Sequence, residues 1–340
     1  MQAAGKGVRT SVKAKAIDRP RTWASRIDWR DPLTLTVIGV ALVLAYLSLF
    51  PTAMLFYGSF TTTPLGQTGE LTLANYVTAY ADPETYTLLL DSFVFALGSS
   101  VLSLVLALAL AWITVRTNAP WRGIFELTAI VPNIFPPVLI AISWTLLLSP
   151  SVGLLNAVLK SVFNLSEAPF NIYSMPGLIF VEGLILTPLA YLIISAALRG
   201  MDPALEESAR ITGSSQFQIV RRITFPLMRP AILAAGMLNL VRALESFDTP
   251  AIIALPARIE VFTTKIYREA LAAYPPNYNL AATYGVSLLA IALVFVALYR
   301  HYTARVETFA TVPARATART PSTWGGGSTR PRRARWRSWC

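Results

Sequence analysis

Three ionisable side chains interrupt an otherwise apolar stretch of the chain. Arg242, Glu245 and Asp248 lie at intervals of three residues. This spacing predicts one helical face on which Arg242 and Glu245 neutralise each other and Asp248 continues one turn outward. Charges at bilayer depth are costly and usually face a bundle interior or a water-filled path. We therefore expect the stripe to line a translocation path or gate, or to be a buried pair that fixes helix packing or the contact with a second membrane subunit.

Two further acids are candidates for the same path. Glu182 lies inside the predicted span 176–198, and Asp91 lies near the outer end of the predicted span 88–115.

Residue types needed for enzymatic chemistry are scarce. The chain has one histidine, His301, and one cysteine, Cys340, and it contains no nucleotide-binding G-x-x-x-x-G-K-[ST] loop. We expect no catalytic residue, no metal site and no cofactor, and we expect the protein not to be an enzyme. If the protein works against a gradient, a separate partner chain hydrolyses the ATP.

A polar, arginine-rich segment, residues 199–230, separates two apolar stretches. Asp202 followed by Pro203 predicts a helix start, and a short helix over Ala204–Ile211 would end at Gly213. A second run, Gln216–Arg222, is expected to end before Pro226, because the residue ahead of a proline disfavours helical geometry. Two short helices joined at a glycine would form an elbow.

The composition predicts an all-α polytopic membrane protein. Of the 340 residues, 54% are hydrophobic and 14% are charged. A first anchor helix, 33–56, is longer than the apolar core of a signal peptide. A 57–87 loop lacks Lys and Arg, and the transmembrane domain follows at 88–300. Its predicted spans are 88–115, 124–148 with prolines that break it, 176–198, 231–255 and 280–300, with a short interfacial helix at 154–163.

Basic residues fix the expected topology of these six spans. Eight Lys and Arg lie in a basic arm, 1–32, five lie in the 199–230 loop and nine lie from Arg300 onward, against four in the predicted outer loops. The positive-inside rule then places both termini and the elbow in the cytoplasm. The net charge of +11 therefore reflects membrane topology, and we expect no nucleic-acid partner.

The elbow resembles a known motif. Glu207, Ser208 and Ala209, then three residues, Gly213, nine residues, and Ile223 to Pro226 resemble the EAA motif of importer-type ABC transporter permeases. That motif reads E-A-A, three, G, nine, I-x-L-P, so Ser208 and Phe225 are mild departures. The resemblance implies that the elbow is the coupling helix that contacts the ATP-hydrolysing subunit. The implied coupling residues are Glu207, Ser208, Ala209, Gly213, Arg222, Ile223 and Pro226.

A finer resemblance concerns the cargo. VRALESFDTPAIIALPARIEVFTTKIYREA, residues 241–270, is similar to permeases of the iron(III), thiamine and polyamine branch, most of all the iron(III) type. The resemblance implies a location in a bacterial cytoplasmic membrane. It also implies several partners: two ATP-binding subunits, an extracytoplasmic solute-binding protein, the lipid bilayer, and a second permease half that is identical, separate or fused.

The C-terminal tail, 301–340, mixes Arg, Gly, Pro and Trp without periodicity after Phe309, and is expected to be disordered. One hypothesis is that 311–340 results from a reading-frame shift in the first half of a fused permease. The other is a basic tail held near anionic lipids.

Two other function classes compete with the importer subunit. An ion-gradient-driven secondary transporter would show two halves of similar span pattern, and no such internal repeat is visible in the sequence. A polytopic membrane enzyme would need clustered His, Asp or Glu at span ends, and such clusters are missing.

Overall fold

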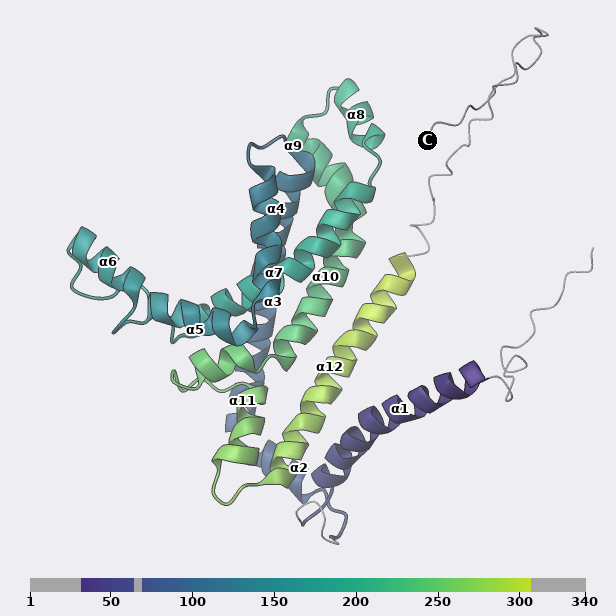
Figure 1. Ribbon diagram of the computed structural model, residues 1–340, viewed down its shortest axis with the longest axis vertical. Coiled ribbons are helices and arrows are strands. Elements are labelled where there is room, and N and C mark those ends of the chain that lie inside the picture. Colours follow the sequence, from purple (N-terminus) through teal and green to yellow (C-terminus); the bar gives the residue numbers. More distant parts are fainter. Residues whose placement is uncertain (1–31, 64–68, 307–340) are drawn as a thin grey trace, which may run out of the picture.

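The computed structural model describes residues 32–63 and 69–306, and these residues are mostly helical (Figure 1). The predicted arm and most of the tail, including residues 311–340, lie outside the described residues. The α-helices are α1 (Pro32–Ser59), α2 (Ala74–Ala81), α3 (Glu84–Arg116), α4 (Arg122–Ile130), α5 (Pro137–Leu148), α6 (Leu154–Phe163), α7 (Met175–Gly200), α8 (Ala204–Ile211), α9 (Gln216–Ile219), α10 (Phe225–Glu245), α11 (Phe262–Tyr267) and α12 (Tyr278–Val306). One 3-10 segment, η2 (Val131–Ile134), and three π segments, η3 (Val220–Thr224), η4 (Pro250–Ala254) and η5 (Arg268–Ala272), complete the described part.

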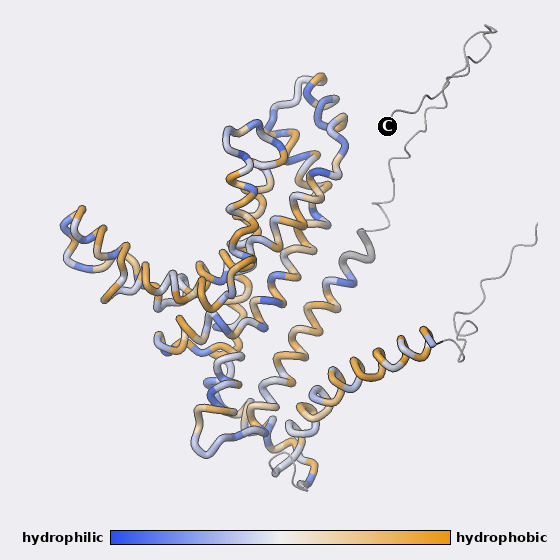
Figure 2. Tube along the Cα trace, in the orientation of Figure 1, coloured by the Kyte–Doolittle hydropathy of each residue, from blue (hydrophilic) through white to orange (hydrophobic). Residues whose placement is uncertain are grey.

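The all-α membrane architecture is confirmed. Five helical segments are long and apolar enough to cross a bilayer, namely α1, α3, α7, the run from α9 through α10, and α12. A sixth exists if the bent pair of α4 with η2 and α5 counts as one span. Apolar residues follow the long helices, and polar residues gather near α8 and near α2 and α11 (Figure 2).

The third predicted span, 124–148, is not one straight helix. Its two halves, Arg122–Ile134 and Pro137–Leu148, are bent by 109° relative to each other. The proline at position 136 is extended, with ψ of 135°, which ends the first half before α5 begins. As a result α5 and α6 project sideways from the bundle (Figure 1).

The boundaries of the fifth predicted span were wrong. The helical run extends over Gln216–Glu245, so it begins inside the predicted loop and ends ten residues before 255. Pro226 does not stop it, because the π turn η3 widens the helix just before the proline: the Phe225 N–H bonds to the Val220 carbonyl, five residues back. The wider turn moves backbone carbonyls away from the proline ring.

The bundle is built around α3, α7 and α10, which pack through small and polar side chains. The buried face of α3 includes Ala96, Ser100, Ser103, Ala107 and Ala111. On the facing helix α7, a methyl group at Gly183 would approach a Leu102 side-chain carbon to 2.8 Å. Such close approach of backbones is typical of membrane helix packing.

Helix α1 diverges obliquely from the neighbouring α12, and its apolar window buries nothing inside the chain (Figure 1). The C-terminal end of α12 points toward the end of the molecule that carries α8, whereas α2 lies at the opposite end. This arrangement separates the α8 elbow from the predicted outer segments that contain α2 and α11 by the length of the bundle.

Candidate functional site

The elbow begins with helix α8, which has the predicted bounds. The Asp202 carboxylate accepts a hydrogen bond from the Ala204 N–H at 3.0 Å and so caps its first turn. After α8 the chain turns at Gly213, whose φ of 85° lies in the left-handed region. The predicted elbow between two short helices, joined at this glycine, is therefore present.

Most of α8 faces away from the bundle. Glu207 and Ser208 are exposed, while Ala209 is half-buried. Apolar side chains share this exposed surface: Ile211 is 88% and Phe217 is 72% exposed. Apolar residues at the tip of a polar loop form a surface suited to binding another protein.

The second arm of the elbow is continuous with α10. Ser215 and Gln218 form a reciprocal capping box at the start of α9. Arg222 is exposed on the π turn, while Ile223 and Pro226 are half-buried. A displacement of α9 therefore acts directly on α10, because no loop separates them.

One elbow residue was missed by the sequence reasoning. Glu206, directly before the motif, is 7% exposed and is the only buried residue of α8. Its carboxylate accepts a hydrogen bond from Thr224 Oγ1 at 3.0 Å and lies 3.4 Å from Arg116 Nη2. The only sequence signal was its position next to Glu207, since Arg116 is ninety residues away.

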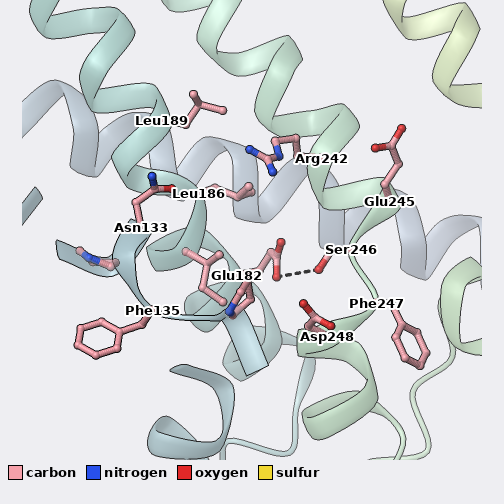
Figure 3. A pocket seen from close by; sticks show the side chains of 13 residues that line it. Asn133, Phe135, Glu182, Leu186, Leu189, Arg242, Glu245, Ser246, Phe247 and Asp248 are labelled. Carbon is pink, nitrogen blue, oxygen red and sulfur yellow. Dashed lines mark hydrogen bonds between the residues drawn. The ribbon is translucent and has the colours of Figure 1, made fainter. Parts of the chain in front are cut away.

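A second candidate site is a cavity of about 540 Å³ deeper in the bundle, between α7, the end of α10 and the bend at η2 (Figure 3). Its lining includes Asn133, Phe135, Glu182, Leu186, Leu189, Arg242, Glu245, Ser246, Phe247 and Asp248. The cavity thus brings together all four sequence-predicted path residues. Asp91 does not line it.

Glu182 is the most buried of the cavity acids, at 3% exposure. Ser246 Oγ donates a hydrogen bond to Glu182 Oε2 at 3.1 Å (Figure 3). Ser246 follows the last residue of α10, and its carbonyl accepts a bond from Thr263 Oγ1 at 2.8 Å. The break in α10 therefore has hydrogen-bond partners for its backbone, as membrane interiors require.

The predicted Arg242–Glu245 pair was wrong. Among the described residues no ion pair joins them, and Figure 3 shows their side chains pointing in different directions. Asp248 also does not continue the α10 face, because α10 ends at Glu245 and Asp248 lies beyond the break at 246 and 247, in the helical turn that leads into η4. Arg242 and Glu245 are both exposed, so neither charge is buried without a partner.

The cavity is mixed in charge. It contains three carboxylates and one guanidinium. Within the described ranges no three His, Cys, Asp or Glu side chains are grouped in a way that could hold a metal ion. The C-terminal end of α10 also opens here, which adds partial negative charge.

A comparison with protein families shows which family the chain belongs to. Residues 99–308 match the family described as "Binding-protein-dependent transport system inner membrane component". The chain belongs to this family. The matched region includes α7, the elbow and α10, so this permease carries its elbow and its cavity within the part that defines the family.

Curated relatives are permease proteins of different transport systems. The permease is 26% identical over 268 residues to the "Putative ferric transport system permease protein FbpB 1" of Haemophilus influenzae, covering 78% of this chain and 40% of that protein. It is 30% identical over 207 residues to the "Putative 2-aminoethylphosphonate transport system permease protein PhnU" of Salmonella typhi, covering 60% of this chain and 68% of that protein. The permease thus spans well under half the length of the ferric relative.

Among solved structures, the permease is similar to a chain of a bacterial ABC transporter involved in the import of the acidic polysaccharide alginate. The TM-score is 0.64 at 20% identity, covering 81% of this chain and 96% of that chain. At this identity the likeness establishes the fold.

Proposed function

We propose that this permease is a membrane-spanning subunit of an ATP-driven importer in a bacterial cytoplasmic membrane. The observation that carries the proposal is the α8 elbow, which combines the motif residues, a glycine in the left-handed conformation and exposed apolar side chains at one end of the bundle. An ATP-binding subunit is the partner that fits this surface, and two of them act on two permease halves.

The coupling residues of this proposal are Glu207, Ser208, Ala209, Gly213, Arg222, Ile223 and Pro226. The exposed members bind the ATP-binding subunit, while the half-buried Ile223 and Pro226 connect that contact to α10. Because α9, η3 and α10 form one helical run, rotation of the elbow tilts α10 instead of bending a loop.

The cavity between α7, α10 and η2 is the proposed translocation path, with Glu182, Arg242, Glu245 and Asp248 on its surface. Both termini and the elbow lie in the cytoplasm in this proposal, and an extracytoplasmic binding protein delivers the cargo at the opposite end. Similarity to a ferric-system permease supports an iron(III)-type cargo, with polyamine or thiamine as the alternatives.

A second permease half completes the translocation unit. It is either another copy of this chain, a separate homologue or a fused continuation, and the greater length of the ferric relative is compatible with the last. The exposed apolar surface of α1 is available to lipid and to that second half.

The experiment is affinity purification of the tagged chain from bacterial membranes, with mass spectrometry of bound proteins, followed by uptake assays in reconstituted vesicles. Radiolabelled ferric citrate, 2-aminoethylphosphonate, thiamine and spermidine serve as probes. Copurification of an ATP-binding subunit and ATP-dependent uptake of one probe are expected. Uptake driven by an ion gradient without ATP contradicts the proposal.

A further inference from the structure

The α8 helix is attached to the bundle through a polar contact. Glu206 is its only buried residue, and no buried apolar side chain of α8 reaches the bundle. Burying a carboxylate is unfavourable unless charged or hydrogen-bonding partners compensate for the lost water. The partners of Glu206 therefore determine how α8 is held.

Those partners come from separate helices. Thr224, at 2% exposure, ends the π turn η3 directly before α10, and its hydroxyl donates to Glu206 Oε1. Arg116 is the last residue of α3, and its Nη2 lies 3.4 Å from the same oxygen. The same Nη2 also donates to the Leu198 carbonyl in the last turns of α7 at 3.2 Å. We call Arg116, Leu198, Glu206 and Thr224 the elbow junction.

The elbow junction is well protected from water. The side chains of Arg116 and Glu206 are 13% and 10% exposed. Charged hydrogen bonds are directional, and they strengthen where the local dielectric is low. A contact of this kind resists sliding better than an apolar contact does, so it suits the transfer of movement.

Two features leave room for a second arrangement of the junction. Arg116 Nε is buried and has no hydrogen-bond partner among the described residues. A modest shift of Glu206 would let its two oxygens engage Nε and Nη2 together, in the fork geometry that arginine favours. In addition, an apolar cavity of about 180 Å³, lined by Trp112, Val220 and Thr224 among others, lies beside the π turn and gives that turn space to move.

We propose that Glu206 is a positioning residue that transmits movement of α8 to α3, α7 and α10 through Arg116 and Thr224. This inference rests on the proposed function, because it assumes that an ATP-binding subunit moves α8. This contact is a second route into the bundle, besides the continuous α9–α10 run. Glu206 and Arg116 lie outside the recognised motif, and Thr224 occupies a position that the motif leaves open.

The test uses the complete permease with its ATP-binding subunits in lipid nanodiscs, and it needs no cargo. Leu189→Cys, in a background with Cys340→Ser, reports on the cavity because Leu189 lines it. The rate at which a maleimide labels this cysteine is measured with and without ATP plus vanadate. Coupling energies between sites typically change such an equilibrium by about 5-fold or more. ATP hydrolysis is measured in the same samples.

Glu206→Gln and Thr224→Val are the test variants. They are expected to keep ATP hydrolysis while losing most of the ATP-dependent change in labelling. Thr224→Ser is the matched control that keeps the hydroxyl. Glu126→Gln is the matched control that removes an exposed ion pair, Arg199–Glu126 at 2.7 Å, near the same end of the bundle. Both controls are expected to behave as the parent does.

Thr224→Val decides the outcome if Glu206→Gln does not assemble. The proposal is overturned if the test variants keep the parental ATP-dependent change, or if both controls lose it to the same degree. A parent that binds no ATP-binding subunit, or whose cavity labelling does not respond to ATP, would instead overturn the proposed function and this inference with it.

Discussion

Ser246 donates a hydrogen bond to Glu182 across 3.1 Å, and this bond joins the end of α10 to the middle of α7. Ser246 lies in the break directly after α10, and it lines the cavity together with its neighbours Glu245, Phe247 and Asp248. A charged cavity next to an interrupted helix is the arrangement that membrane transporters use for substrate sites. The Ser246–Glu182 hydrogen bond therefore connects α7 with the end of α10, two of the three central helices of the bundle, at the proposed path.

Removing the charge of Glu182 tests the path. Glu182→Gln keeps an oxygen that can accept the bond from Ser246, so the fold should persist while the cavity loses one negative charge. We expect uptake of the transported probe to fall by about tenfold or more, since charged groups at this depth are seldom neutral to function. Asp91→Asn is the control, because Asp91 is a span acid outside the cavity lining. Equal uptake by Glu182→Gln and the parent would remove Glu182 from the path.

The backbone of Gly213 tests the elbow. No atom lies within 4 Å of a methyl group built there, so the cost of a side chain comes only from the φ of 85°. A left-handed conformation costs a residue with a Cβ about 1–2 kcal/mol, least for asparagine. Gly213→Val should therefore uncouple uptake from ATP hydrolysis, and Gly213→Asn should retain more coupling. Gly123→Ala, which adds a methyl group in open space in α4, should match the parent in both rates.

The core contact between α3 and α10 predicts a stability difference. Asn239 Nδ2 donates to Ser103 Oγ at 2.7 Å, and Asn239 is fully buried. Ser103→Ala leaves that donor with only the 3.3 Å contact to the Leu186 carbonyl, and bonds of this type in membranes contribute about 0.6–2 kcal/mol. Thermal unfolding in detergent should show a lower Tm for Ser103→Ala.

The control for that comparison is Ser99→Ala. The Ser99 hydroxyl is buried on the same helix, yet it has no hydrogen-bond partner among the described residues. Its removal should leave the Tm unchanged or raise it, because an unsatisfied buried hydroxyl is itself unfavourable. A larger loss of stability for Ser99→Ala than for Ser103→Ala would contradict the assigned contact.

The sequence predicted the long helices well, because apolar length is a local property. The short helix over Ala204–Ile211 and the turn at Gly213 were also predicted, since caps and glycines act within a few residues. Pro226 misled the boundary prediction, because a π turn upstream relieves the clash that normally stops a helix at proline.

The pairing of charges could not be predicted for a related reason. Arg242 and Glu245 have favourable spacing, but both are exposed at the cavity and form no ion pair with each other. Glu206 has helical spacing only with Arg210, yet it lies next to Arg116 because α3 and α8 end at the same side of the bundle. Three-dimensional placement, more than spacing, decides which buried charges meet.

Site-specific photo-crosslinking from Ile211 tests the central claim most directly. Ile211 is 88% exposed at the elbow, whereas Tyr274, near the other end of the bundle, is 100% exposed and serves as the control position. With a photoreactive phenylalanine at position 211, the account predicts a crosslink to a cytoplasmic ATP-binding subunit, and no such crosslink from position 274. A crosslink from 211 to an extracytoplasmic protein, or labelling of Ile211→Cys by an impermeant reagent added outside intact cells, would contradict the account.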